Sequence, residues 1–356
     1  MNISREDVLV FTAVLAGCGS MSRGWIEAIS EHPLLRGRVR VVGLVDLDRS
    51  AAEARAAEFG LGDAVIGTDL DAVLAQTAPD LLFDVVVPVA RAGVVETGLR
   101  HQCHVLSEKP MAASLEEGRA MIAQARAAGR IHAVIQNRRF IAGVRRIRRL
   151  VDSGAIGELA SLNCDFFIGA HFGGFRDDME HALLLDMAIH TLDAARFMSG
   201  KVPRAVYCLE TNPPGSWYRH GAAANAIFEF SDNVVFNYRG SWAAEGANTS
   251  WESAWRIVGS KGTLLWDGED SFEARIVAGD TGFLRDLQQI DVPPPADEGQ
   301  THGHASVLAD FLDAIEAGGQ PETVSSDNIK SLAMVFAAID SARSGQRVNI
   351  EIEDSK

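Results

Sequence analysis

An apolar run from Val8 to Ala16 leads directly into the turn Gly17-Cys18-Gly19, and the next glycine or proline is Gly24. This order predicts a strand, a tight turn and the start of a helix. In such an arrangement the backbone amides and the positive end of the helix face a pyrophosphate. Ser22 replaces the third glycine of the Gly-x-Gly-x-x-Gly pattern. A dinucleotide site therefore needs support from elsewhere in the chain.

The same letters, Leu15-Ala16-Gly17-Cys18, also look like a bacterial lipoprotein cleavage box. A signal peptide needs a positive region ahead of its apolar core. Here Glu6 and Asp7 follow Arg5, and Thr12 interrupts the core. No other stretch approaches the ~20 unbroken apolar residues of a membrane span. We therefore expect a cytoplasmic protein that has no membrane partner.

The chain has 356 residues, and about 150 residues per domain predicts two domains. Its net charge of −15 argues against a nucleic-acid partner, which would require a basic face. The four cysteines lie far apart without Cys-x-x-Cys spacing, so we expect reduced structural thiols.

The first part of the chain alternates between strand and helix patterns. Apolar segments at Val39–Asp46, Leu81–Val87, His104–Leu106 and Ile131–Ile135 alternate with helical segments at Ser50–Phe59, Arg91–Arg100 and Leu115–Ala128. Ser114 and Glu117 form a capping box for the last helix, and Gly129 ends it. This repetition predicts an α/β fold in which residues 1–135 form a doubly wound parallel sheet.

From residue 136 onward, longer strands with alternating polar residues dominate. We expect a helix at Gly143–Asp152 and strands at Ala160–Phe167, Ala205–Leu209, Ala223–Phe230, Val234–Trp242 and Ala254–Val258. Helices at His304–Ala317 and Asp327–Ser344 end the chain. Residues 136–356 are therefore predicted to form an α+β domain with an open, mostly antiparallel sheet.

Asp46 ends the second strand, where a dinucleotide-binding unit places an acidic residue on the adenosine ribose hydroxyls. The simpler alternative is a turn or helix-capping aspartate. A carboxylate there would repel the 2′-phosphate of NADP, so NAD is the favoured cofactor. The nearby Arg49 leaves NADP open.

Two further motifs carry chemistry. Glu108-Lys109-Pro110 follows a strand at the edge where such sheets bind ligands, although from these residues alone a surface Glu–Lys pair ahead of a helix is the favoured interpretation. Leu183–Asp193 predicts a helix on which Asp186 and His190, four residues apart, share one face. A carboxylate beside an imidazole suits a general base. The alternative is a histidine buried against a core carboxylate.

Taken together, the chain resembles the glucose–fructose oxidoreductase / inositol dehydrogenase family of NAD(P)-dependent oxidoreductases. The resemblance covers nearly the whole length. It rests on Gly17-Cys18-Gly19, Asp46, Glu108-Lys109-Pro110, Asn137-Arg138-Arg139-Phe140, Gly154-Ala155-Ile156-Gly157, Asp186 with His190, and Gly259-Ser260-Lys261-Gly262-Thr263.

The resemblance implies an N-terminal Rossmann domain for NAD and a C-terminal domain that binds substrate and often forms the homodimer or homotetramer interface. It implies reversible oxidation of a secondary alcohol of a sugar or cyclitol, with Lys109, Asp186 and His190 as the catalytic residues. The implied cofactor contacts are Gly17, Gly19, Ser20, Met21, Asp46, Pro88, Glu108, Lys109 and Asn137. The family supplies no metal, and we expect none.

The chain departs from the family pattern at three places. Pro88-Val89-Ala90-Arg91 stands where relatives often carry Pro-Asn-x-x-His, and Gln136 replaces an aromatic residue. Glu180-His181-Ala182-Leu183 replaces a glycine-rich segment ahead of Asp186. That segment borders the substrate in the family, so family analogy is weakest for the identity of the substrate.

The expected substrate contacts combine family matches with residues suited to sugars. Aromatic rings stack on the C–H faces of sugars, although most tryptophans simply pack. The candidates are Lys109, Arg139, His181, Asp186, His190, Trp217 and Tyr218. Two other functions stay open: a lyase or glycosidase that uses a metal or transient oxidation by NAD, and a non-catalytic dinucleotide sensor.

Overall fold

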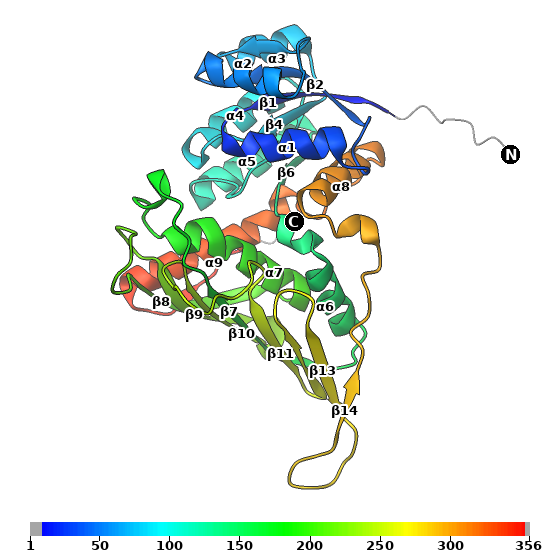
Figure 1. The fold of residues 1–356 in the computed structure, drawn as a ribbon, viewed down its shortest axis with the longest axis vertical. Helices are drawn as coiled ribbons and strands as arrows, with labels where there is room; N and C mark the ends of the chain where they lie inside the picture. Colours follow the sequence, from blue (N-terminus) through cyan, green and yellow to red (C-terminus); the bar gives the residue numbers. More distant parts are fainter. Residues whose placement is uncertain (1–8, 353–356) are drawn as a thin grey trace, which may run out of the picture. The chain divides into compact units, whose positions relative to one another are not determined.

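The computed structural model describes residues 9–352, which divide into two compact units (Figure 1). The first unit contains residues 9–136 and His304–Ile329. The second contains Asn137–Gly303 and the described residues from Lys330 onward. Val8, the predicted start of the first strand, and the charged residues just before it lie outside the described residues.

The first unit is built on a six-stranded parallel sheet with the order β3-β2-β1-β4-β5-β6. Its strands are β1 (Phe11–Ala16), β2 (Val39–Val45), β3 (Val65–Gly67), β4 (Leu81–Asp84), β5 (His104–Ser107) and β6 (His132–Val134). This strand order defines a doubly wound Rossmann sheet. The predicted parallel sheet is confirmed, while the short β3 was not predicted.

Helices connect these strands: α1 (Ser20–Glu31), α2 (Arg49–Glu58), α3 (Leu70–Thr77), α4 (Pro88–Arg100) and α5 (Leu115–Ala128). The predicted caps of α5 are confirmed, because the Ser114 hydroxyl accepts the Glu117 amide at 3.1 Å and Gly129 has φ 62°. Helix α4 starts at Pro88, so β4 is shorter than the predicted strand Leu81–Val87.

A segment near the chain's end also belongs to this first unit. Helix α8 (His304–Glu316) is bound by Arg38, whose Nη2 lies 2.6 Å from Asp313 Oδ1 and 3.0 Å from Glu316 Oε1. The Val134 amide donates to the Thr323 carbonyl at 3.1 Å. The predicted division at residue 135 assigned this segment to the second domain. Local patterns do not show that a chain returns to an earlier unit.

The second unit contains a nine-stranded sheet with the order β14-β13-β12-β11-β7-β10-β9-β8-β15. Its strands are β7 (Leu159–Phe167), β8 (Pro203–Thr211), β9 (Ala223–Phe230), β10 (Val235–Ser241), β11 (Ala254–Gly259), β12 (Gly262–Trp266), β13 (Phe272–Val277), β14 (Leu287–Ile290) and β15 (Val348–Asn349). Only β7 and β10 pair in parallel among these strands, so the predicted mostly antiparallel sheet is confirmed. The last four strands were not predicted.

Helices α6 (Ala142–Asp152), α7 (Ile189–Ser199) and α9 (Ser325–Ser344) run along one face of this sheet (Figure 1). A Cβ on Gly143 of α6 would lie 2.1 Å from the Trp266 ring of β12, so the helix packs directly on the strand. At the other end, the Cys208 amide of β8 donates to the Ser341 hydroxyl of α9 at 2.8 Å.

Shorter helices complete this unit: 3-10 helices at Asn137–Phe140, Gly174–Arg176, Ser231–Asn233 and Glu298–Gln300, and a π-helix at Leu183–Ala188. The helix predicted over Leu183–Asp193 is continuous, but its first six residues are π-helical and α7 begins at Ile189. Because a π-turn contains more residues than an α-turn, the rotation between Asp186 and His190 differs from that of an ideal α-helix.

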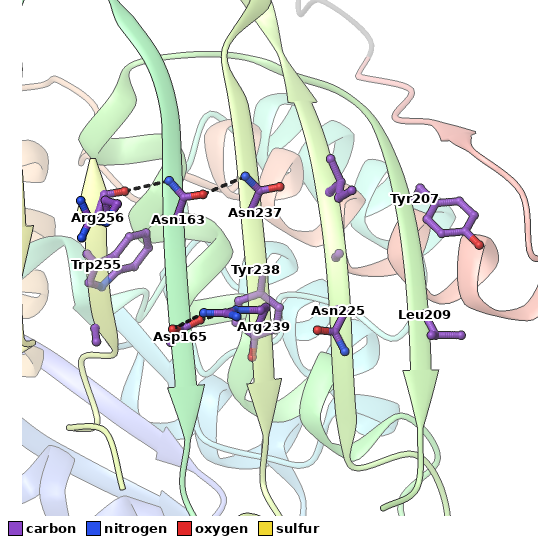
Figure 2. A pocket seen from close by; sticks show the side chains of 13 residues that line it. Asn163, Asp165, Tyr207, Leu209, Asn225, Asn237, Tyr238, Arg239, Trp255 and Arg256 are labelled. Carbon is purple, nitrogen blue, oxygen red and sulfur yellow. Dashed lines mark hydrogen bonds and ion pairs between the residues drawn. The ribbon is translucent and has the colours of Figure 1, made fainter. Parts of the chain in front are cut away.

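The opposite face of the sheet is open and slightly hollowed (Figure 2). Its side chains come from alternate positions of β7 to β11, as strand geometry requires. Arg239 forms a two-point ion pair with Asp165 at 2.7 and 2.6 Å, and the Asn237 amide donates to Asn163 at 2.9 Å. Beside these polar groups, Tyr207, Leu209 and Ile227 stay about half exposed.

Candidate active site

The turn after β1 requires glycine at its first position. Gly17 has φ 94°, and a Cβ there would lie 2.7 Å from the carbonyl carbon of Val85. The Gly17 amide donates to the Val45 carbonyl at 2.8 Å, and the Val85 amide donates to Ala16 at 2.8 Å. The turn is therefore pressed against the ends of β2 and β4. A glycine at this position gives a phosphate close access to the backbone.

Helix α1 opens directly from this turn, with Gly19 at its N-cap followed by Ser20 and Met21. A glycine cap has no side chain to cover the first amides, which leaves the positive helix end open to an anion. Ser22 is fully buried at the third glycine position, and its hydroxyl donates to the Gly19 carbonyl at 2.6 Å. The Ser22 hydroxyl therefore has its hydrogen-bond partner within the turn.

Asp46 follows β2 and binds the same turn. Its Oδ2 accepts the Cys18 amide at 2.7 Å, and its Oδ1 accepts the Asp48 amide at 2.9 Å. Burial raises the pKa of the Cys18 thiol to about 11, and the Asp46 charge acts in the same direction. Arg49 lies nearby, but it binds Glu53 at 2.8 Å and the Ile66 carbonyl. This turn and carboxylate fit the pyrophosphate and ribose of NAD.

Glu108-Lys109-Pro110 follows β5 at the same edge of the sheet. Glu108 is buried: its Oε1 accepts the Trp25 indole N–H at 2.9 Å, and its Oε2 accepts the Lys109 amide at 3.1 Å. The Lys109–Pro110 bond is cis. His304, the first residue of α8, has its Nε2 4.0 Å from Glu108 Oε1. The backbone that carries Lys109 is thus fixed by a buried carboxylate.

Sequence reasoning missed Arg91, which is buried in the first turns of α4. Its Nε pairs with buried Asp84 at 2.8 Å, Nη2 donates to the Val86 carbonyl at 2.6 Å, and Nη1 donates to the Pro110 carbonyl. Burial raises the pKa of Asp84, while the Arg91 charge opposes that shift. Arg91 therefore ties the segment before Pro88 to the loop of Lys109. The sequence did contain a signal for Arg91, because this residue belongs to the segment Pro88–Arg91 that departs from the family pattern.

These predicted cofactor residues converge within the first unit. The turn at Gly17, Asp46, Pro88 and Glu108-Lys109 follow β1, β2, β4 and β5, which are neighbours in the parallel sheet. The carboxyl ends of parallel strands meet at one edge, where such sheets bind ligands. Asn137 was predicted with them, and it opens the 3-10 helix at the start of the second unit.

In the second unit, Asp186 lies in the π-helix and His190 in the first turn of α7. Arg176 Nε donates to Asp186 Oδ2 at 2.8 Å, and both side chains are partly accessible. The guanidinium of Arg176 also lies over the rings of Phe172 and Phe175, with 5.1 and 4.9 Å to their centroids. Asp186 is therefore held by a cation that the sequence did not indicate.

Arg139, which was predicted as a substrate contact, is paired with a buried carboxylate of the second unit. It is buried, and its Nε and Nη2 each donate to the Asp193 carboxylate at 2.7 Å. Asp193 is itself fully buried in α7 and also accepts the Ser331 hydroxyl at 2.6 Å. This two-point pairing uses one N–H edge of the guanidinium. The substrate role of Arg139 stays a prediction.

The side chains of Trp217 and Tyr218 donate hydrogen bonds to the same backbone carbonyl. The Trp217 indole N–H and the Tyr218 hydroxyl donate to Ala170 at 3.1 and 2.8 Å. Trp217 stacks on His171 with ring centroids 3.6 Å apart, and Tyr218 stacks on Trp242 at 6.2 Å. Burial raises the pKa of Tyr218 to about 12, so its hydroxyl keeps its proton. The Tyr218 ring is buried, and the Trp217 ring is the more accessible of the two.

His181, the last predicted substrate residue, precedes the π-helix by two positions and has φ 56°. Its Nδ1 lies 2.5 Å from Glu210 Oε2 in β8. Across residues 9–352, no group of three or more histidine, cysteine or acidic residues is arranged to hold a metal ion. In the same range, no helix has both the length and the apolar character needed to cross a membrane.

Comparison with known proteins agrees with this geometry. Residues 11–136 match the model of the oxidoreductase family with an NAD-binding Rossmann fold, and residues 144–265 match the GFO/IDH/MocA C-terminal domain. The two stretches together span more than half of the chain. The protein belongs to the GFO/IDH/MocA family of NAD-binding oxidoreductases.

Among its relatives, 1,5-anhydro-D-fructose reductase from Ensifer adhaerens is 27% identical over 95% of this chain and 98% of that protein. Inositol 2-dehydrogenase from Rhizobium meliloti is 25% identical over 94% and 98%. An oxidoreductase from Agrobacterium radiobacter, solved with NAD+, L-tartaric acid and magnesium, shares the fold with a TM-score of 0.82. It is 21% identical over 96% of this chain and 98% of that one.

We predict that Gly17→Ala weakens NAD binding and lowers the thermal unfolding midpoint, because the new Cβ would press into the Val85 backbone at a φ that alanine rarely adopts. The matched control is Gly24→Ala, where nothing lies within 4 Å of the added Cβ. That change is expected to stabilise helix α1 by about 1 kcal/mol. Equal NAD affinity in Gly17→Ala and the wild type, measured by fluorescence titration, would contradict the assigned role of the turn.

Proposed function

We propose that this protein is an NAD-dependent dehydrogenase that reversibly oxidises a secondary alcohol of a sugar or cyclitol. The observation that carries the proposal is the turn at Gly17, whose backbone requires glycine and whose Cys18 amide is bound by Asp46. The names of the relatives support the substrate class: inositol 2-dehydrogenase, D-apiose dehydrogenase and 1,5-anhydro-D-fructose reductase. These names favour a dehydrogenase over the lyase and sensor alternatives.

We assign the catalytic roles to Lys109, Asp186 and His190. Bound NAD supplies the hydride acceptor for the alcohol carbon. The Lys109 ammonium polarises the substrate oxygen by a charge-assisted hydrogen bond. His190 takes the hydroxyl proton as the general base. Asp186, paired with Arg176, balances the charge that develops when His190 is protonated.

The cofactor contacts of the proposal are Gly17, Gly19, Ser20, Met21, Asp46, Pro88, Glu108, Lys109 and Asn137. NAD is favoured over NADP because Asp46 places a negative charge at the ribose position, while Arg49 is engaged by Glu53 and the Ile66 carbonyl. The four cysteines are buried free thiols, which suits the reducing cytoplasm.

The open face of the second unit supports a homodimer or homotetramer. Tyr207, Leu209 and Ile227 are 47%, 55% and 51% exposed on this face, which also carries the Arg239–Asp165 pair. Figure 2 shows Tyr207 and Leu209 on strand β8, with Asn225 between them and Arg239. Half-exposed apolar side chains clustered around a few satisfied polar groups are typical of a surface that another chain covers. Because an isologous contact uses the same face twice, one such face is sufficient for a dimer.

Replacing Lys109 by Met or His190 by Asn is expected to lower kcat by about 10²–10⁴-fold, since each change removes a proton-transfer or polarising group. NAD binding should be left largely intact, because most of the proposed cofactor contacts are unchanged in both variants. The assay screens purified protein against sugars, cyclitols and glycosides and follows NADH absorbance, with NAD binding measured separately. Full turnover in both variants would rule out these roles.

Asp46→Ala should shift the ratio of kcat/KM for NAD to that for NADP toward NADP by about tenfold or more. The variant loses a charged hydrogen-bond partner of the ribose and the repulsion of the 2′-phosphate. Steady-state kinetics with both cofactors measure the ratio. Asp63→Ala is the matched control, because it removes an exposed carboxylate of the first unit ahead of β3 and should leave the ratio unchanged. An unchanged ratio in Asp46→Ala would show that Asp46 does not read the ribose.

Ile227→Asp on the open face should reduce the mass in solution toward that of the 38.3 kDa chain, because it buries an unpaired charge in the subunit contact. Light scattering coupled to size exclusion measures the mass. Val10→Asp, a change at an exposed apolar residue ahead of β1, serves as the control and should leave the mass of the wild type unchanged. A wild type that is already monomeric would contradict the proposal.

A further inference from the structure

His181 adopts a backbone conformation that glycine normally provides. Its φ is 56°, in the left-handed region that glycine favours and that histidine adopts more often than most other side chains. Non-glycine residues in such conformations cost about 1–3 kcal/mol and cluster at functional sites. The chain therefore places an imidazole at a backbone position that glycine more commonly occupies.

A buried carboxylate holds this imidazole. His181 Nδ1 lies 2.5 Å from Glu210 Oε2, and the two side chains are 14% and 8% exposed. Strand alternation explains where Glu210 lies: Tyr207 and Leu209 of β8 face the open side of the sheet, while Cys208 and Glu210 face the covered side. The carboxylate thus approaches His181 from inside the second unit.

Gly221 leaves room for the Glu210 side chain that pairs with His181. A Cβ on Gly221 would lie 2.4 Å from the Glu210 carboxyl carbon, so a larger residue there would displace the carboxylate. The second oxygen of Glu210, Oε1, is buried and has no hydrogen-bond partner among residues 9–352. Buried polar atoms are nearly always bonded. The left-handed backbone of His181 and the buried Glu210 oxygen without a partner both lower the free energy of unfolding. A role in binding explains why the chain keeps both.

The pair is connected to the segment that carries Asp186. The Leu185 amide donates to the His181 carbonyl at 2.9 Å, and the π-helix Leu183–Ala188 begins two residues after His181. Single π-turns are frequent at functional sites. His181 is therefore fixed at the entrance of the segment in which we placed the catalytic Asp186.

We propose that the Glu210–His181 pair binds a second hydroxyl of the substrate, beside the one that is oxidised. With Nδ1–H donated to Glu210, the neutral imidazole presents Nε2 as an acceptor for an O–H donor. This inference rests on the proposed dehydrogenase function. It narrows the substrate to a vicinal diol, such as a cyclic polyol, and excludes an isolated secondary alcohol. Glu210 is a positioning residue that fixes the tautomer and orientation of His181.

His181→Asn is the decisive variant. Asparagine tolerates the left-handed conformation and offers Glu210 an N–H donor, but it has no acceptor where Nε2 lies. The probes are the most rapidly oxidised polyol among D-glucose, D-xylose and myo-inositol, and its analogues that lack a hydroxyl on a carbon next to the oxidised one. In His181→Asn, kcat/KM for the parent polyol should fall about 10- to 100-fold. For the deoxy analogue that lacks the hydroxyl bound by His181, the same substitution should change kcat/KM little.

His181→Gly provides an independent readout. Glycine fits the backbone and leaves a space of imidazole size, so added imidazole should restore part of the activity of this variant. Gln102→Gly is the matched control, because Gln102 is an exposed non-glycine residue with φ 61° in the first unit. It should leave kcat/KM for all probes unchanged, with or without imidazole.

The outcomes separate the two proposals. A wild type that reduces NAD with none of the polyols overturns the dehydrogenase function and this inference with it. An active wild type whose His181→Asn variant loses equal activity toward the parent and every deoxy analogue, or loses none, overturns only the diol-binding role. Correctly folded His181→Gly without rescue by imidazole also counts against that role.

Discussion

The hydrogen bond from the Cys18 amide to Asp46 Oδ2, 2.7 Å long, is the constraint on which the nucleotide-binding unit depends. It joins the turn after β1 to the carboxylate after β2, so the two groups expected to contact pyrophosphate and ribose are fixed relative to each other. The close approach of Gly17 to Val85 adds the end of β4 to the same arrangement. A cofactor that binds such a preorganised edge loses less entropy than one that must order the loops.

Each unit also contains a buried arginine–aspartate pair next to a proposed catalytic residue. Arg91 with Asp84 binds the carbonyl of Pro110, which follows Lys109. In the second unit, Arg139 binds Asp193, which lies in α7 three residues after His190. Buried pairs are weak evidence for stability, because desolvation offsets much of their attraction. Their position suggests a different benefit, namely the fixed geometry of the segments that carry the chemistry.

Much of the fold could be predicted from local patterns. Buried parallel strands appear as continuous apolar runs, and Ser114, Glu117 and Gly129 marked the ends of α5 correctly. The sequence did not reveal β3 or the strands β12 to β15, because runs of two to six residues are too short to show a clear apolar periodicity. The placement of α8 with the first unit depends on long-range contacts such as Arg38 with Asp313, which no local pattern records.

The candidate site could be predicted at positions where the backbone geometry dictates the residue type. It was harder to predict where the role of a side chain depends on which other side chain it contacts. Gly17 and Asp46 lie where strand, turn and charge require them, whereas Arg139 was predicted as a substrate contact and is bound by buried Asp193. Arg91, Arg176 and Glu210 were missed because their partners lie 7, 10 and 29 positions away in other elements or loops, where no helix or strand period relates them.

The segment from His181 to His190 shows why substrate identity is the least predictable property of this chain. The helix predicted there is present, but its first six residues form the π-helix Leu183–Ala188, which changes the rotation between Asp186 and His190. The glycine-like backbone at His181 remains, although the residue is not glycine. A chain can thus keep the geometry of its redox site while it changes the side chain presented there. Under the proposed function, the turn at Gly17 provides the cofactor site that the family shares, and the choice of alcohol depends on such local departures.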